Sequence, residues 1–273
     1  MPFGIRFIAE PLACIAVAFE KHLASLYIWS IMAKTKKYSN PPLTEAVFEL
    51  FFETSKWSPA IPGIFYSKVQ KKYPIISQSP GGFGISFGPK GLQLGPGNND
   101  LTQFKSTDGT SIIQLSNNLL TVNKLPEYGG WESYKLMILK ALDVLKEVLD
   151  VTKVNRIGLK AINKIDINKH SYENFKEFFT VYPILPEGSN TSSIQLNYET
   201  PVNSDDILAI SLATLNKEKG YEAPTLFQLY FTKVKNVTIE EIEDWIEIAH
   251  GHLHNAFDIS LTEKCKNSFD NVQ

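Results

Sequence analysis

Two strand-like runs carry charged residues four positions apart, and these residues are the best candidates for chemistry in the sequence. Both runs alternate polar and apolar residues, so residues i, i+4 and i+8 share one face of an extended strand. The first run places three carboxylates on that face and the second places three cations, which gives six candidate binding residues: Glu45, Glu49, Glu53, Arg156, Lys160 and Lys164. If the two strands are neighbours in a sheet, their opposite charges form a ladder across it.

Two interpretations of this ladder stay open. In one, the charges line a polar groove that binds a partner or a small molecule. In the other, they are solvated ion pairs, each of which contributes little to stability. A ligand site predicts a pocket containing Glu49 and Lys160. A protein-binding module instead predicts a shallow open face with exposed aromatic residues such as Phe51 and Tyr198.

Other residues that could do chemistry lack the partners they would need. His250 and His254 are four apart on a predicted helix, but no glutamate lies between them in the metalloprotease arrangement and no third ligand is evident. The run Gly84–Gly88 has the spacing of a G-x-S-x-G nucleophile elbow, yet it lies among predicted strands and turns. We therefore predict no catalytic residue, no metal and no cofactor.

The elements that must position the charged runs occur in the same order twice. The first set is a strand over Leu43–Glu53, a short helix beginning at Ile61, strands reaching Leu125, and a helix over Trp131–Leu149 with an apolar stripe at helical spacing.

The second set begins with a strand over Val154–Ile167. A short helix after Ser171 and three further strands follow. Thr238 and Glu241 form a capping-box pattern before a closing helix that is predicted to reach about Lys264.

This duplicated order predicts an α+β fold. Two pseudo-repeats, residues 38–152 and 153–273, would form one curved antiparallel sheet with the helices on one face and the other face open. Residues 1–37 are predicted to be an N-terminal extension outside the fold. Met32 and the lysines after it are typical of a bacterial start, so residues 1–31 are interpreted as an upstream extension.

Composition limits the environment and the partners. The chain has 273 residues and a formal net charge of −2, so no whole-protein basic field attracts a polyanion. Two cysteines, Cys14 and Cys265, make no disulfide framework, which favours a cytoplasmic location. No uncharged run reaches the ~20 residues of a membrane-spanning helix.

Four segments carry a resemblance to a known family. They are Pro41–Glu49, Gly130–Glu132, Arg156–Ile165 and Ala256–Thr262. Together they resemble an uncharacterised, sporadically distributed family of prokaryotic proteins, over roughly Tyr38 to Lys264. The resemblance implies a prokaryotic origin and a patchy distribution of the kind common among mobile or defence-linked genes. It implies no established chemistry.

The order of elements also resembles the topology of the TATA-binding-protein fold. This is an analogy of fold, and a fold does not define a function. The TATA-binding protein holds DNA on a basic sheet face, whereas the first strand here offers Glu45, Glu49 and Glu53, which would repel phosphate. Nucleic-acid binding is therefore not expected.

We predict a non-enzymatic cytoplasmic binding or regulatory protein, linked to a mobile defence or toxin–antitoxin locus. Its partner is expected to be another protein or a second copy of this chain, as in a homodimer, with a small molecule as a further candidate and no membrane. The alternative is a small-ligand-binding protein, or a hydrolase, that uses a charged groove at the junction of the repeats.

Overall fold

The fold is known from a computed structural model, which describes residues 38–79, 83–88, 91–96, 101–167, 172–182, 184, 193–216, 224–234 and 237–270. The chain divides after Lys37 into two compact units, and all described residues belong to the second, Tyr38–Gln273. The predicted extension, residues 1–37, lies outside the described residues. So do Cys14 and Ser171.

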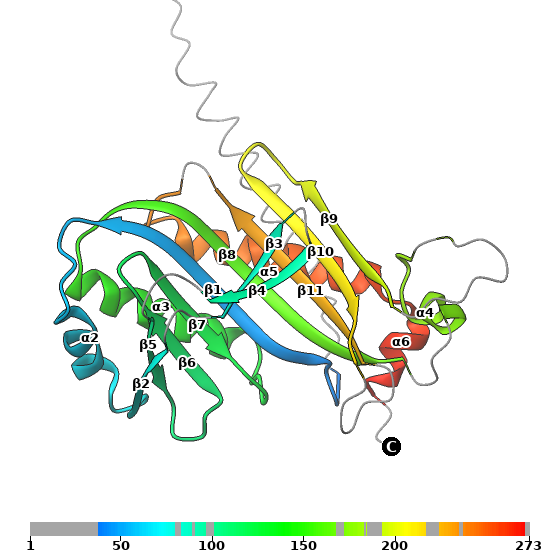
Figure 1. The fold of residues 1–273 in the computed structure, drawn as a ribbon, viewed down its shortest axis with the longest axis horizontal. Helices are drawn as coiled ribbons and strands as arrows, with labels where there is room; N and C mark the ends of the chain where they lie inside the picture. The colour runs from blue at the N-terminus through cyan, green and yellow to red at the C-terminus, as the bar shows by residue number, and fades with distance from the viewer. Residues whose placement is uncertain are drawn as a thin grey trace, which may run out of the picture. The chain divides into compact units, whose positions relative to one another are not determined.

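One antiparallel sheet dominates the part of the chain that the structure describes (Figure 1). Its nine strands lie in the order β2 (Ile75–Ser79), β5 (Leu101–Lys105), β6 (Ser111–Leu115), β7 (Leu119–Lys124), β1 (Leu43–Thr54), β8 (Val151–Asp166), β11 (Pro224–Lys233), β10 (Asp206–Thr214) and β9 (Gln195–Pro201). A separate hairpin pairs β3 (Phe83–Gly88) with β4 (Gly91–Pro96). The predicted α+β class with an antiparallel sheet is confirmed, and the two charged runs are the neighbouring central strands β1 and β8.

The helices are α2 (Ile61–Val69), α3 (Trp131–Val148), α4 (Tyr172–Phe178), α5 (Ile242–Ser260) and α6 (Glu263–Ser268). The long helices α3 and α5 lie on the same face of the sheet, behind it in the view of Figure 1. The Tyr134 hydroxyl of α3 donates a 2.8 Å hydrogen bond to the Val122 carbonyl of β7. We call this face of the sheet the helix face.

The predicted closing helix is wrong in its limits at both ends. It begins at Ile242 rather than near Thr238, whose hydroxyl donates to the Glu241 carboxylate instead of capping a backbone amide. It ends at Ser260, because Leu261 forms a β-bridge with Phe179. Thr262 then caps α6 by accepting a hydrogen bond from the Cys265 amide.

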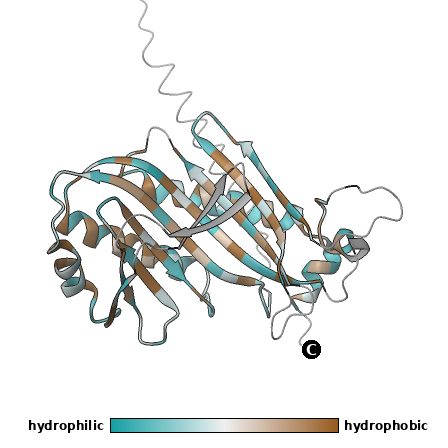
Figure 2. Ribbon diagram, viewed as in Figure 1, coloured by the Kyte–Doolittle hydropathy of each residue, from teal (hydrophilic) through white to brown (hydrophobic). Residues whose placement is uncertain are grey.

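Alternation along β1 builds the core on the helix face. Phe48, Leu50 and Phe52 point to this face and are fully buried. Phe48 lies opposite Leu159 of β8, so the central strand pair contributes apolar groups from both sides. Burying each such side chain stabilises the fold by about 1.5–3 kcal/mol. Figure 2 shows the resulting alternation of hydrophobic and hydrophilic bands along the strands.

A tryptophan near the start of each long helix holds the helical layer together. Trp131 donates to Glu247 across the two helices and stacks on His250 at a centroid distance of 4.1 Å. Trp245 donates to Asp206 of β10 and packs on Phe231 of β11. The helix α3 is therefore bound to α5, and α5 to the sheet.

The histidines of α5 take part in this packing. His250 stacks on Trp131, and His252 stacks on Phe231 at 4.7 Å. Across the described part of the chain, no group of three or more His, Cys, Asp or Glu side chains is placed to hold a metal ion. Nor does any helix there have the length and apolar character needed to cross a membrane.

Candidate functional site

The pairing register of β1 and β8 decides which charges meet. We call the side of the sheet away from α3 and α5 the polar face. On it, Glu49 lies directly opposite Gly158, and Lys160 lies opposite Val47. Glu49 and Lys160 are therefore diagonal rather than direct neighbours across the two strands. In this register Phe48 faces Leu159 and Leu50 faces Ile157 on the helix face.

At the centre of the two charged runs, one cation meets one carboxylate. The Lys160 ammonium lies 3.4 Å from the Glu49 carboxylate, as a diagonal neighbour. Glu45 instead accepts a 2.7 Å hydrogen bond from the Asn123 side chain, and Glu53 pairs with Lys153.

The two remaining cations lie opposite apolar residues of the neighbouring strands. Arg156 lies opposite Phe51, with its guanidinium carbon 4.0 Å from the centre of the Phe51 ring. The position of Lys164 on β8 places it opposite Leu226 of β11, and its backbone amide donates to the Pro42 carbonyl. The structure therefore brings Glu49 and Lys160 together, and it places Glu45 beside Asn123 and Glu53 beside Lys153.

Gly158 makes room for a residue that the ladder did not include. Tyr230 of β11 lies opposite Lys160, and its ring leans over Gly158 to place its hydroxyl 2.9 Å from Glu49. A Cβ at position 158 would lie 2.5 Å from the Tyr230 ring and hydroxyl. Because Gly158 has no side chain, Tyr230 of β11 can reach across β8 and contact Glu49 of β1.

Burial and the nearby charge of Glu49 keep the Tyr230 hydroxyl protonated. Burial, followed by the charge of Glu49, raises the pKa of Tyr230 far above its usual range. The phenol therefore stays protonated and donates its proton to the carboxylate. The Lys160 ammonium lies 4.7 Å from the centre of the Tyr230 ring, where a cation–π attraction adds to its pairing with Glu49.

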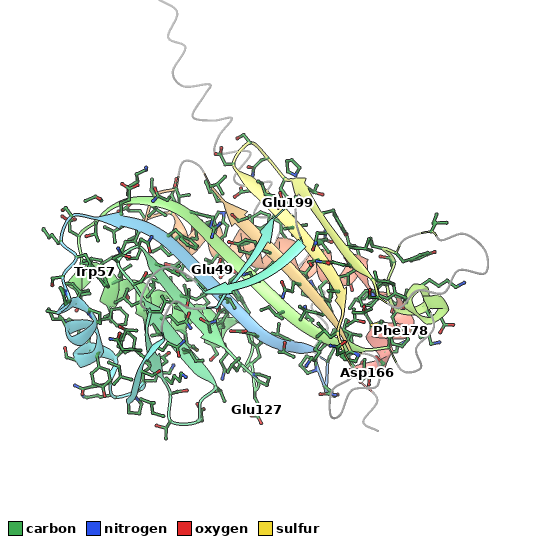
Figure 3. All side chains as sticks on the ribbon, in the orientation of Figure 1. Glu49, Trp57, Glu127, Asp166, Phe178 and Glu199 are labelled. Carbon is green, nitrogen blue, oxygen red and sulfur yellow. The ribbon has the colours of Figure 1, made fainter. Side chains whose placement is uncertain are left out.

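The centre of the polar face is buried, which corrects the expectation of an open, solvated face. The side chains of Lys160 and Glu49 are only 7% and 18% exposed. We define the polar cluster as Glu49, Arg156, Lys160, Gln228, Tyr230 and Thr232, which come from three adjacent strands. In Figure 3, Glu49 marks its position midway along β1. The solvated ion-pair interpretation fits Glu53 and Lys153, whose side chains are more than half exposed, but not the Glu49–Lys160 pair.

Hydrogen bonding is satisfied on one side of the cluster. The Thr121 hydroxyl of β7 has acceptors on Gln114 and Asn123, at 3.1 Å and 2.8 Å. Asn123 in turn donates to Glu45. The β7–β1 side of the polar face is therefore a closed network.

On the β8–β11 side, several buried polar atoms have no hydrogen-bond partner within the structure. They are Nε of Arg156, both amide atoms of Gln228 and the hydroxyl of Thr232. Two similar atoms, on Thr225 and His250, belong to the helix side. Buried polar groups are nearly always paired, so a concentration of unpaired ones indicates a place where another molecule supplies the partners.

Sequence reasoning missed Tyr230, Gln228 and Thr232. Their strand was predicted, and the alternation of Gln228, Tyr230 and Thr232 with Phe227, Leu229 and Phe231 was a readable signal for a polar side. The sequence did not show which strand lies next to this one, so the contact of Tyr230 with Glu49 could not be predicted.

Replacing Gly158 with alanine should displace Tyr230. The new methyl group must push the ring away, which breaks the Tyr230–Glu49 hydrogen bond. We expect the free energy of unfolding, measured with urea, to fall by about 1–2 kcal/mol. Gly63→Ala is the control, because its added Cβ would meet nothing within 4 Å. Equal stability of Gly158→Ala and the wild type would contradict the close packing of Tyr230.

Comparison with known proteins adds little to this geometry. No model of a protein family matches the chain, and no curated protein matches it. Among solved structures, the chain is similar to the crystal structure of DynU16, a protein in the dynemicin biosynthetic locus. The identity is 11%, with 77% of this chain and 96% of the other covered, and the TM-score is 0.22. Similarity at this level supports no argument about fold or function.

Proposed function

We propose that this protein binds a small polar molecule against the β8–β11 side of the polar cluster. One observation carries the proposal: buried, unpaired polar atoms of Arg156, Gln228 and Thr232 lie on the same face of two adjacent strands. Each such atom costs about 1–3 kcal/mol of stability while it stays unpaired. A ligand that supplies the missing partners recovers this free energy as affinity.

The charged residues support a polar ligand rather than an apolar one. Lys160 and Glu49 are held as a buried pair, so they present a fixed dipole beside the unpaired atoms. Arg156 adds a guanidinium that is planar and always charged. The bulky Phe51 and Tyr230 rings pack beneath these cations and hold them in position.

A protein-binding module receives less support than a small-ligand site. Tyr198 pairs with Ile210 of β10, which places it on the helix face and away from Phe51. These two residues, which were examples of the aromatic side chains that such a module would expose, are thus on opposite sides of the sheet. The regulatory role, a homodimer and the link to a mobile defence or toxin–antitoxin locus stay as predictions.

We also propose that the fold consists of two pseudo-repeats with a TATA-binding-protein-like order. The supporting observation is the mirrored strand order around the central pair: β7, β6 and β5 follow outward from β1, and β11, β10 and β9 follow outward from β8. We likewise propose that the protein belongs to the sporadically distributed prokaryotic family and that it is cytoplasmic.

Two threonines of β11 provide a matched test of the binding site. Thr232 lies on the polar face and Thr225 on the helix face, and both have buried, unpaired hydroxyls. Valine keeps the shape of each side chain. We expect small molecules that raise the melting temperature of the wild type to lose most of this effect with Thr232→Val and to keep it with Thr225→Val.

The measurement is a thermal-shift screen of metabolites on the full chain, with mass spectrometry of small molecules that co-purify. A ligand present at about 100 times its Kd stabilises the folded state by about 2.7 kcal/mol, which is readily seen in a melting curve. If every hit acts equally on both variants, the site is not on the polar face.

A further inference from the structure

Gln228 is the least satisfied residue of the polar cluster. Its side chain is on the polar face of β11 and is 2% exposed, and neither its amide nitrogen nor its amide oxygen has a partner within the structure. An unpaired primary amide leaves both donors and an acceptor unused in the same plane. No other side chain in the cluster is unpaired at both kinds of atom.

The neighbours of Gln228 cannot easily supply what it lacks. Directly across the sheet it meets Ile162 of β8, which has no polar side-chain atom, and Ser211 of β10. The Ser211 hydroxyl already donates to the Asn197 side chain at 2.5 Å. Ser211 therefore has no donor left for the Gln228 oxygen, although its own oxygen can still accept.

Small residues lie next to Gln228 on the same face. Ala209 and Ala213 flank Ser211 along β10 and lie opposite Tyr230 and Leu226. Both alanines are partly exposed whereas Gln228 is 2% exposed, so a ligand reaches its amide only if the groups that cover it move aside. The buried unpaired amide and the small neighbours point to the same position.

The two unpaired atoms differ in kind, and this limits the ligand. An anion could accept from the Gln228 nitrogen but would leave the oxygen unpaired, and a cation would do the reverse. A neutral planar group with an N–H beside a C=O satisfies both atoms with two parallel hydrogen bonds, as glutamine does with the edge of a nucleobase.

We propose that Gln228 recognises a ligand with a planar amide edge, meaning a carboxamide, a lactam or a nucleobase. This inference rests on the proposed small-molecule function and names the class of its ligand. Gln228 makes the paired hydrogen bonds, and the small residues of β10 admit the plane of the ligand beside it.

The probes are uracil and nicotinamide, each offered at millimolar concentration to the full chain. The matched negative probe is 1,3-dimethyluracil, which keeps the ring and the carbonyl groups but has no N–H donor. Binding is measured by saturation-transfer NMR, and the side-chain NH₂ signals of Gln228 report where the probe lies.

We expect uracil or nicotinamide to bind, to shift the Gln228 signals, and to bind at least tenfold more tightly than 1,3-dimethyluracil. Gln228→Leu should weaken binding at least tenfold. Gln114→Leu, on the polar face of β6, should not, because Gln114 belongs to the network with Thr121. Equal affinity for uracil and its dimethyl form, or for the wild type and Gln228→Leu, overturns the proposal, as does the absence of binding.

The result also separates this inference from the proposed function. If the amide probes fail while another small molecule binds in a manner that Thr232→Val abolishes, the ligand class is wrong and the binding function stands. If no small molecule depends on either Thr232 or Gln228, both proposals fall.

Discussion

Replacing Glu49 with glutamine is expected to lower the free energy of unfolding by about 3 kcal/mol. Glutamine keeps the size of the side chain and an oxygen that can accept from Tyr230. It removes the negative charge that neutralises Lys160, whose side chain is only 7% exposed. An uncompensated buried ammonium must either lose its proton or draw in water, and both cost free energy.

Glu53→Gln is the control for this prediction. It makes the same change on the same strand, but Glu53 and its partner Lys153 are 56% and 63% exposed. Water solvates either charge without the other, so no measurable change in stability is expected.

The double variant Glu49→Gln, Lys160→Met completes the test. Removing both charges leaves no unpaired ion, so most of the lost stability should return. The three variants are compared with the wild type by urea unfolding at pH 7. A loss in Glu49→Gln no larger than that in Glu53→Gln would show that the Lys160 charge is not buried, and the polar cluster would lose its physical basis.

Proton binding at His250 in the unfolded chain should lower the free energy of unfolding by about 2–3 kcal/mol as the pH drops from about 6.5 to about 4. Burial, with a smaller contribution from the nearby His254, lowers the pKa of His250 from its usual 6.5 to about 4. In this window the unfolded chain binds a proton at position 250 that the folded chain does not. Acid therefore favours the unfolded state.

The groups around His250 explain why it stays neutral. The Trp131 ring of α3 stacks on it, and its Nδ1 is buried with no partner within the structure. Glu247, the one neighbour that would favour the charged imidazolium, is already bound by Trp131 and Lys135.

The measurement is urea unfolding of the wild type, His250→Gln and His254→Gln at several pH values between 7.5 and 4. Burial also lowers the pKa of His254, and carboxylates titrate at the acid end, so every variant should lose some stability. We expect His250→Gln to lose the least. If the stability of His250→Gln depended on pH as that of the wild type does, His250 would have the same pKa in the folded and unfolded states, and the prediction would be wrong.

The order of the elements could be read from the sequence because local patterns carry it. Alternation placed Phe48 and Leu50 on one side of the first strand and Glu45 and Glu49 on the other. The apolar stripe of α3 predicted its limits to within one residue at its C-terminal end. The strand β2 was missed, because its five residues show no clear alternation after Pro74.

The candidate site was predicted only in part, because some of its residues are far apart along the chain. The residues Glu49 and Lys160 were identified because their own strands show the pattern. Tyr230 was not, because it is 181 residues from Glu49 and meets it through a strand that pairs with β8.

The sequence by itself determined which side chains share a face, since a strand has a period of two that needs no partner. The tertiary structure alone decided the register. Pairing of Phe48 with Leu159 and of Leu50 with Ile157 sets Glu49 opposite Gly158 and makes Lys160 its diagonal neighbour. This register pairs Glu49 with Lys160 and lets Tyr230 reach Glu49 over Gly158. It depends on how strands far apart in the chain pack against each other, which the period of a single strand does not specify.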